Sequence, residues 1–240
     1  MRATGVERTL IVAAMPIPDR ILPRGQRVLE GPPPRFGLDA YLTRSVDVPL
    51  DWRLVVDGDV EQPLALGLDE LIADARVDRA LDLHCVTTWT ATDLRWSGRA
   101  FHDVWTRVVV PRARPRPEVA HVLAAGLDGY QAAIPLEEAL AADALLADRL
   151  DGQPVSLDHG APLRLVVPQL YGYKSVKHLC RLSFRVDPPA VPVARFLAHP
   201  RGRVDLEERS GVGAQRFWRL LYRSLVPLFL RRARPHQLAR

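Results

Sequence analysis

The stretch HGAPLRLVVPQLYGYKSVKHLCRLSFRV, residues 159–186, carries the strongest structural signal in the chain. Its apolar run 163–167 lies between glycine and proline residues, which is typical of a short buried strand. A glycine-bearing loop follows, and residues 176–186 have the composition of a longer strand. We expect this longer strand to close the domain, with the loop held between the two strands.

Similar strand and turn signals recur upstream every ten to fifteen residues. Further strands are predicted at 53–60 (broken by an Asp57-Gly58 turn), 82–88, 119–125 and 144–150, with turns at 128–129 and 151–154. Short helices are predicted at 68–75, 98–110 and 134–141, and three prolines predict a loop at 111–117. Strands mixed with short helices indicate an α+β fold with a β-rich core.

The net charge of +5 is unevenly distributed along the 240 residues. Residues 1–190 contain 22 basic and 25 acidic side chains, whereas residues 191–240 contain 11 arginines and three acidic residues. The basic character therefore belongs to the tail. This disfavours nucleic-acid binding by the body of the protein, because phosphate recognition needs a basic patch on the folded surface.

Composition divides the chain into three parts. Residues 1–44 form a predicted extended arm, since 16–35 is rich in proline, glycine and arginine. Residues 45–190 form the predicted domain, and residues 191–240 form a basic tail. No apolar run is long enough to span a bilayer, and the apolar stretch 10–15 is short for a signal peptide. Together with two unpaired cysteines, this predicts a cytoplasmic location.

The tail contains a predicted amphipathic helix at 213–233 that Pro227 interrupts. One face gathers the apolar residues and the opposite face the arginines; the apolar face consists of Phe217, Trp218, Leu221, Tyr222, Leu225, Leu228 and Phe229. Two interpretations remain open. The apolar face packs on this domain or on a second subunit, which is the commoner arrangement, or it makes a peripheral contact with a membrane.

Two features could carry chemistry. Cys85 lies where a predicted strand meets a loop, and it is either a small buried apolar residue or a thiolate that acts as nucleophile or metal ligand. The second is the loop with Lys174, Ser175 and Lys177, which holds the only two lysines of the chain. Ammonium groups and backbone amides suit a phosphate or a polyanionic cofactor, whereas a solvated surface loop is the alternative. Cys180 is expected in the core.

Six segments in a fixed order resemble the sulfite-oxidase-type molybdopterin domain, over roughly residues 45–187. They are HCVTTW (84–89), LRWSGRAFHDV (94–104), LDGYQAAIPLEEAL (127–140), LLADRLDGQPV (145–155), HGAPLRLVVP (159–168) and YGYKSVKHLCRLSF (171–184). The resemblance implies a mixed, β-rich sulfite-oxidase-like fold and a molybdenum cofactor, Mo-molybdopterin.

The resemblance also implies roles for individual residues. Cys85 matches the single cysteine that binds molybdenum beside a pterin dithiolene, and a soft thiolate suits this metal. The residues that match the segments binding the pterin and its phosphate are His159, Arg164, Ser175, Val176 and Lys177. Tyr130 matches an active-site tyrosine, and Arg44 matches an arginine beside the cofactor. The implied activity is oxygen-atom transfer coupled to two-electron redox chemistry.

The sequence departs from sulfite oxidases just after Cys85. Residues 87–90 are Thr, Thr, Trp and Thr, where those enzymes carry basic residues for a dianion. We therefore expect an S- or N-oxide as substrate in preference to sulfite. No haem motif is present, so a separate electron-transfer partner is expected. The alternative is a cofactor-free binding module of the same fold, attached to a membrane or partner through the basic helix. Metal analysis would separate the two hypotheses.

Overall fold

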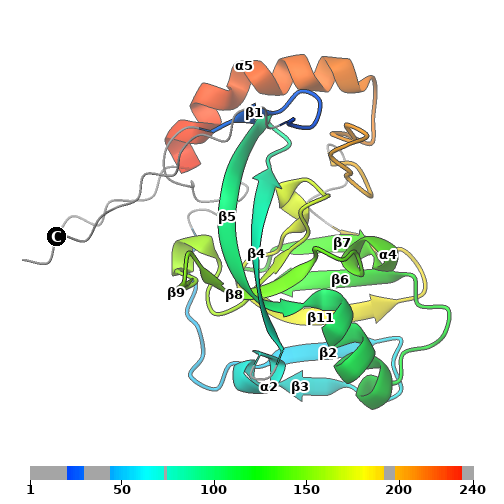
Figure 1. The fold of residues 1–240 in the computed structure, drawn as a ribbon. Helices are drawn as coiled ribbons and strands as arrows, with labels where there is room; N and C mark the ends of the chain where they lie inside the picture. Colours follow the sequence, from blue (N-terminus) through cyan, green and yellow to red (C-terminus); the bar gives the residue numbers. More distant parts are fainter. Residues whose placement is uncertain (1–20, 30–43, 73–74, 192–197, 234–240) are drawn as a thin grey trace, which may run out of the picture.

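Two β-sheets, each with parallel and antiparallel strand pairs, form the body of the protein (Figure 1). This computed structural model describes residues 21–29, 44–72, 75–191 and 198–233. Short helices connect the strands within these ranges. The predicted α+β class with a β-rich core is therefore confirmed.

The first sheet contains the hairpin that carries Cys85. Its strands are β1 (Arg27–Val28), β4 (Arg76–His84), β5 (Trp89–Ala100), β8 (Leu145–Leu150), β9 (Gln153–Pro154) and β10 (Arg164–Val166). The order is β1-β5-β8-β10, with β4 beside β5 and β9 beside β8. His84 at the end of β4 lies opposite Thr90 near the start of β5. Residues 85–88 therefore form the tip of a long antiparallel hairpin.

The second sheet has the order β3-β2-β11-β6-β7. Its strands are β2 (Leu54–Gly58), β3 (Leu64–Leu66), β6 (His121–Gly126), β7 (Gln131–Pro135) and β11 (Leu179–Arg185). The central strand is β11, which runs parallel to β2 and antiparallel to β6. The predicted closing strand thus joins the start of the domain to its middle.

Two apolar clusters hold the sheets together. The larger cluster includes Leu54 of β2, Leu165 of β10 and Leu182 of β11. The smaller one lies around the fully buried Trp96 and includes Leu83 of β4 and Val166 of β10. Burial of such side chains contributes roughly 1.5–3 kcal/mol each. Because β10 contributes to both clusters, the residues that flank it are firmly positioned.

Several predicted element boundaries were wrong. The Trp- and Thr-rich segment after residue 88 is the start of the 12-residue strand β5, and not a loop; such residues favour strands once they are half-buried. Residues 131–135 form β7 and leave only α4 (Leu136–Ala139) as a helix. The first helix, α2 (Leu68–Ile72), begins where it was predicted but ends before the predicted residue 75.

The predicted helix 98–110 begins only at Phe101, because β5 continues to Ala100. It consists of α3 (Phe101–Val104) and the π-helix η1 (Trp105–Ala113). The expected proline-rich loop starts three residues late, because η1 includes Pro111. Pro111 has no N–H and therefore donates no hydrogen bond within η1.

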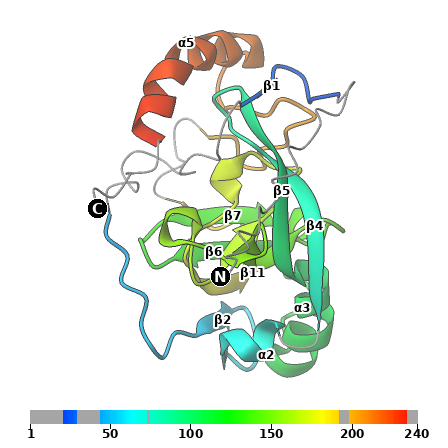
Figure 2. The ribbon, with the colours of Figure 1, turned by 60° about the vertical axis from the view of Figure 1, so that its left-hand side comes forward.

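The arm and the tail meet at one end of the molecule. β1 pairs in parallel with β5 at Trp89 and Thr90, so this part of the arm is regular structure, contrary to expectation. The helix α5 (Gln215–Ala233) lies across this end, above β1 and the hairpin tip (Figures 1 and 2). It runs through Pro227, which is exposed, so water can satisfy the backbone carbonyl that loses its helical partner.

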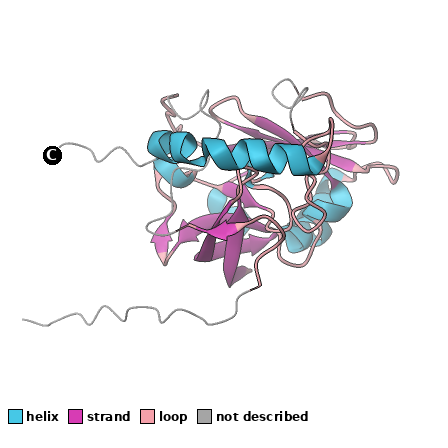
Figure 3. Cartoon of the chain, turned by 90° about the horizontal axis from the view of Figure 1, so that it is seen from above, coloured by secondary structure: helices cyan, strands magenta, loops and turns pink. Residues whose placement is uncertain are grey.

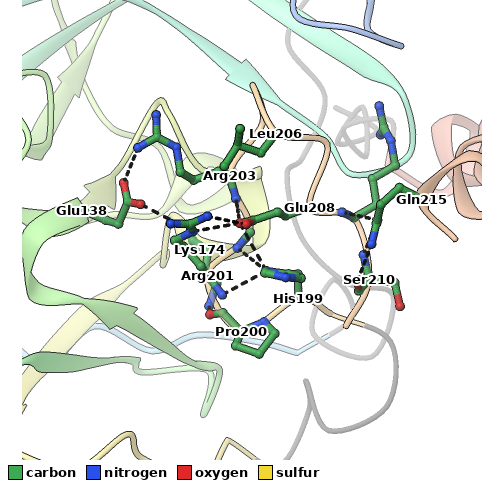
Figure 4. Close-up of polar contacts among 12 residues, drawn as sticks. Glu138, Lys174, His199, Pro200, Arg201, Arg203, Leu206, Glu208, Ser210 and Gln215 are labelled. Carbon is green, nitrogen blue, oxygen red and sulfur yellow. Dashed lines mark hydrogen bonds and ion pairs between the residues drawn. The ribbon is translucent and has the colours of Figure 1, made fainter. Parts of the chain in front are cut away.

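Residues 198–210 tie the tail to the body through a polar cluster (Figure 4). Arg201 forms an ion pair with Glu208, and Arg203 lies 3.5 Å from the buried Glu138 at α4. Lys174 donates hydrogen bonds to the carbonyl oxygens of Ala133 and Pro200. The tail is therefore docked on the domain before α5 begins. Within the described ranges, no helix is both long and apolar enough to cross a bilayer.

Candidate functional site

Cys85 lies in a tight turn at the tip of the β4–β5 hairpin. Its backbone N–H donates to the carbonyl oxygen of Trp89 (2.8 Å), and its carbonyl oxygen accepts from Thr88 N–H (3.1 Å). Thr88 adopts a left-handed conformation with φ of 77°, which closes the turn. Gln26 of the arm donates to the same carbonyl oxygen at 3.2 Å. Arm and hairpin together therefore fix the backbone that carries the thiol.

The Cys85 thiol has polar and charged neighbours. Its Sγ lies 3.0 Å from the hydroxyl of Thr87. The residue keeps partial exposure, yet its sulfur is enclosed closely enough that burial raises the thiol pKa, while Thr87 and the positive charge of Arg209 act in the opposite direction. A metal that binds here must displace the proton, since the thiolate is the ligand.

Arg209 from the tail is the functional candidate that sequence reasoning missed. It is 0% exposed, and it donates to the carbonyl oxygen of Val86 at 2.7 Å. Its guanidinium lies 5.2 Å from the ring centroid of Tyr171 and 3.7 Å from Glu207. A cation therefore lies next to Cys85. Among so many arginines, nothing in the sequence distinguishes this one.

Two tyrosines complete the surroundings of Cys85. Burial raises the pKa of Tyr171 to about 12 and also raises that of Tyr222 on α5, and in both cases the thiolate form of Cys85 adds to the effect. Both hydroxyls therefore remain protonated at neutral pH. The Cys85 group thus draws on four segments: the arm, the hairpin tip, the loop after β10 and the C-terminal tail.

Arg164 on β10 is the centre of a second group. Its side chain is 0% exposed, and its guanidinium lies 4.8 Å from the ring centroid of Trp96. It donates to the carbonyl oxygens of His159 (2.7 Å) and Ser175 (3.5 Å). Burial lowers its pKa to about 9, so the group remains charged at neutral pH. The fold thus maintains a cation in a dry environment.

The loop that follows β10 has a rigid backbone. The hydroxyl of Ser175 accepts a hydrogen bond from Val167 N–H at 3.1 Å, and the carbonyl oxygen of Val176 accepts from Leu165 N–H at 2.9 Å. Val176 itself is fully buried in the larger core cluster. Its predicted contribution to a ligand site is therefore confined to its backbone.

Lys177 lies beside the turn that contains His159. Its Nζ donates to the carbonyl oxygen of Asp158 at 3.3 Å, and His159 Nδ1 lies 2.9 Å from the hydroxyl of Ser156. Only glycine fits at position 160, where the backbone of the turn passes close to Lys177. The φ of Gly160 is +115°, and a Cβ there would lie 3.0 Å from the Cβ of Lys177. The structure therefore brings together His159, Arg164, Ser175 and Lys177 as predicted.

Lys174 does not belong to this group. It is buried, contacts Ala133 and Pro200, and lies over the ring of Tyr173 at 5.7 Å (Figure 4). Burial lowers its pKa to about 8. Of the two lysines predicted to face an anion, Lys174 instead connects the loop to β7 and to the tail.

Tyr130 and Arg44 lie at the turn between β6 and β7. The Tyr130 hydroxyl donates to the carbonyl oxygen of Tyr173 at 2.5 Å, and Arg44 donates to the carbonyl oxygen of Asp128 at 2.5 Å. The loop 171–177 connects the residues around Cys85, the residues around Arg164, and the turn that carries Tyr130. The thiolate form of Cys85 raises the pKa of Tyr171, the Tyr173 carbonyl oxygen accepts from Tyr130, and a Cβ on Gly172 would lie 3.5 Å from the His84 carbonyl oxygen. Cys180 lies on β11 and is half-buried.

Comparison with known proteins gives one matching family model, the oxidoreductase molybdopterin binding domain, over residues 42–191. An uncharacterized oxidoreductase of Bacillus subtilis, YuiH, is 35% identical over 133 residues, which cover 55% of this chain and 65% of that protein. The protein-methionine-sulfoxide reductase catalytic subunit MsrP of Xanthomonas campestris is 33% identical over 145 residues, covering 55% of this chain and 44% of that protein.

Among solved structures, the sulfane dehydrogenase SoxCD of Paracoccus pantotrophus is similar in fold. The TM-score is 0.52 at 23% identity, over 64% of this chain and 43% of the other. At this identity the likeness concerns the fold alone. The chain spans less than two thirds of each of these proteins, and the matched family segment ends before residues 198–233, which supply Arg209 and α5.

Proposed function

Because this chain belongs to the oxidoreductase molybdopterin binding domain family, we propose that it transfers an oxygen atom, coupled to two-electron redox chemistry, with Cys85 as the protein ligand of molybdenum. The observation that carries the proposal is the position of the Cys85 thiol. It lies at a fixed hairpin tip and next to the loop 171–177, whose other end contacts Arg164 and contains Lys177. A soft thiolate and two cations are the groups that such a cofactor needs.

The donor set fits the molybdenum cofactor on chemical grounds. The pterin brings its own sulfur ligands, so one thiolate from the protein is sufficient. The phosphate of the cofactor is an anion, and Arg164 offers a buried cation whose hydration is already lost. Within the described ranges, no group of three or more His, Cys, Asp and Glu side chains could hold a metal ion. When bound, the cofactor supplies the two-electron change and exchanges the oxygen atom.

The protein residues orient the cofactor and the substrate. Arg164, His159, Ser175 and Lys177 would hold the pterin and its phosphate. The predicted role of Tyr130 is to contact the substrate. Its hydroxyl donates to the Tyr173 carbonyl oxygen in this structure, so Tyr130 would have to exchange that hydrogen bond to donate to the oxygen of an S- or N-oxide. Arg44 donates to the Asp128 carbonyl oxygen of the same turn, and its place beside the cofactor stays a prediction.

Metal and pterin analysis tests the proposal directly. The full chain, purified from a host that makes the molybdenum cofactor, should contain molybdenum and pterin in equal amounts. C85S is the informative variant, and C180S is the matched control because Cys180 lies on β11. Protein that carries neither molybdenum nor pterin would refute the proposal and favour a cofactor-free binding module.

For the substrate, we propose an S- or N-oxide in preference to sulfite. The support is that residues 87–90 carry no charge, and that Arg209 is already engaged by Val86 and Glu207. The relative from Xanthomonas is named for sulfoxide reduction. Steady-state assays should give turnover with methionine sulfoxide or an N-oxide and a high KM for sulfite. Efficient sulfite oxidation at low concentration would contradict this proposal.

We propose further that a separate protein exchanges electrons with the site. The name of the Xanthomonas relative, a catalytic subunit, supports such an arrangement. Stopped-flow reduction of the oxidised holoprotein by candidate reduced carriers tests it. A carrier that donates electrons at the rate of turnover with the oxide supports the proposal. The proposal would be contradicted if turnover persisted in the absence of both a carrier protein and any artificial electron donor or acceptor.

A further inference from the structure

The helix α5 exposes an apolar stripe on the side that faces away from the body. The exposed side chains are Phe217 (60%), Leu220 (67%), Leu221 (37%) and Leu228 (44%). Their spacing of three, one and seven residues places them along one side of the helix. Figure 3, seen from above, shows α5 lying in front of the rest of the described chain. An apolar stripe of this kind marks an interaction surface.

The opposite side of α5 is fixed to the body, so the helix cannot roll to bury the stripe there. Arg219 donates to both carboxylate oxygens of Glu207 at 3.0 and 3.1 Å. Gln215 accepts hydrogen bonds from the backbone N–H groups of Arg209 and Ser210. Val226 packs against the apolar cluster around Trp96. Of the arginines predicted to share one face, only Arg219 therefore turns toward the body.

The charge around the stripe is positive. Residues 215–233 include five arginines and no acidic residue, and the exposed Arg216 and Arg223 border the stripe. The neighbouring segment 21–29 adds Arg24 and Arg27, both exposed, and a Cβ on its Gly25 would collide with the Arg219 side chain. A second copy of this chain would bring like charges together.

We infer that the α5 surface, defined as Phe217, Leu220, Leu221 and Leu228 with Arg216 and Arg223, binds an anionic lipid bilayer. A helix that lies flat on its protein can place an apolar stripe among acyl chains, while flanking arginines meet lipid phosphates. The inference goes beyond the proposed function, because it does not depend on the cofactor. Tyr222, whose pKa the thiolate form of Cys85 raises, lies on the inner side of α5, so the bilayer would lie roughly one helix diameter, about 10 Å, beyond Tyr222.

Vesicle flotation of the full chain with its cofactor tests the inference. The vesicles contain phosphatidylcholine alone or with phosphatidylglycerol. Two variants change the surface, F217Q/L220Q/L221Q and R216Q/R223Q. The control L50Q/V110Q changes two exposed apolar residues, one shortly before β2 and one in η1. β2 lies at the end of the molecule opposite α5 (Figure 1). Far-UV circular dichroism establishes that each variant is folded.

The wild type and the control should float with the anionic vesicles only. Loss of two arginines should weaken partitioning about 30-fold, and loss of the three apolar side chains at least about tenfold. The inference is overturned if the wild type does not float, if it binds phosphatidylcholine equally well, or if the control loses binding to the same extent. It is also overturned if light scattering shows a dimer that only the apolar variant dissociates, since the stripe would then bind a second copy.

Discussion

The substitution Glu207→Gln tests how the tail is held over Cys85. Glu207 is buried and faces three arginines: Arg219 at 3.0 Å, Arg24 at 3.6 Å and Arg209 at 3.7 Å. Glutamine keeps the size of the side chain and removes its charge. The fully buried Arg209 would then lose its counter-charge, which costs about 3–5 kcal/mol for a buried pair. We expect the lower end, about 3 kcal/mol. The ion pair of Glu207 with Arg24 adds little to this cost, because Arg24 is largely exposed to water.

For a chain of this length, about 3 kcal/mol corresponds to a fall in Tm of roughly 6–12 °C. The matched control is Asp205→Asn, two residues earlier, whose exposed pair with Arg203 should be worth less than about 1 kcal/mol. Urea unfolding followed by circular dichroism measures both. The double variant E207Q/R209M should lose less than the sum of its single changes. The reasoning fails if E207Q is no less stable than D205N.

Three further predictions concern the site and the loop after β10. C85S should abolish turnover and alter the metal spectrum while pterin remains bound, because Arg164 and Lys177 are intact; an unchanged spectrum with full turnover would show that Cys85 is not the ligand. R164A and K177A should each lower cofactor affinity about ten- to a hundredfold, measured as molybdenum per protein, and full occupancy in both would contradict their assignment. Comparison with K174M should show how burial of Lys174 changes the pH dependence of stability. The folded pKa of Lys174 is lowered to about 8 from 10.5, so the unfolded chain binds more protons between these values and wild-type stability rises with pH there. Relative to K174M, the free energy of unfolding of the wild type should gain roughly 3 kcal/mol from pH 7.5 to 10.5, and a constant difference would refute the shift.

Local patterns predicted the most apolar strands of the fold well. The runs that become β6, β8, β10 and β11 are apolar and bounded by turn residues, so both pattern and burial point to strands. β5 escaped prediction because part of its pairing is with strands far away in the chain. Besides the adjacent β4 it pairs with β8 and β1, and its own sequence contains no signal for these two partners.

The orientation of α5 could not be predicted for a similar reason. A helical wheel gives the relative positions of Phe217, Arg219 and Tyr222, but not which of them faces the body. The choice depends on Glu207, which adopts a left-handed conformation at φ of 53° and presents its carboxylate to Arg219. The helix therefore docks by an edge that contains Arg219, Tyr222 and Val226. Whether the exposed stripe meets a membrane, and whether the protein is cytoplasmic, stay predictions.

The charge beside Cys85 shows why substrate chemistry cannot be derived from neighbouring residues alone. Residues 87–90 are uncharged, yet Arg209, 123 residues beyond Val86, contributes a buried cation at that position. A low affinity for sulfite is thus expected because Arg209 is engaged, and not because a cation is absent. To bind a dianion, Arg209 would have to give up Glu207 and the Val86 carbonyl oxygen. The E207Q variant frees one of these contacts, so its KM for sulfite should fall while its KM for an uncharged sulfoxide stays unchanged. An equal change in both KM values would indicate that Arg209 acts only as a structural link between the tail and the hairpin tip.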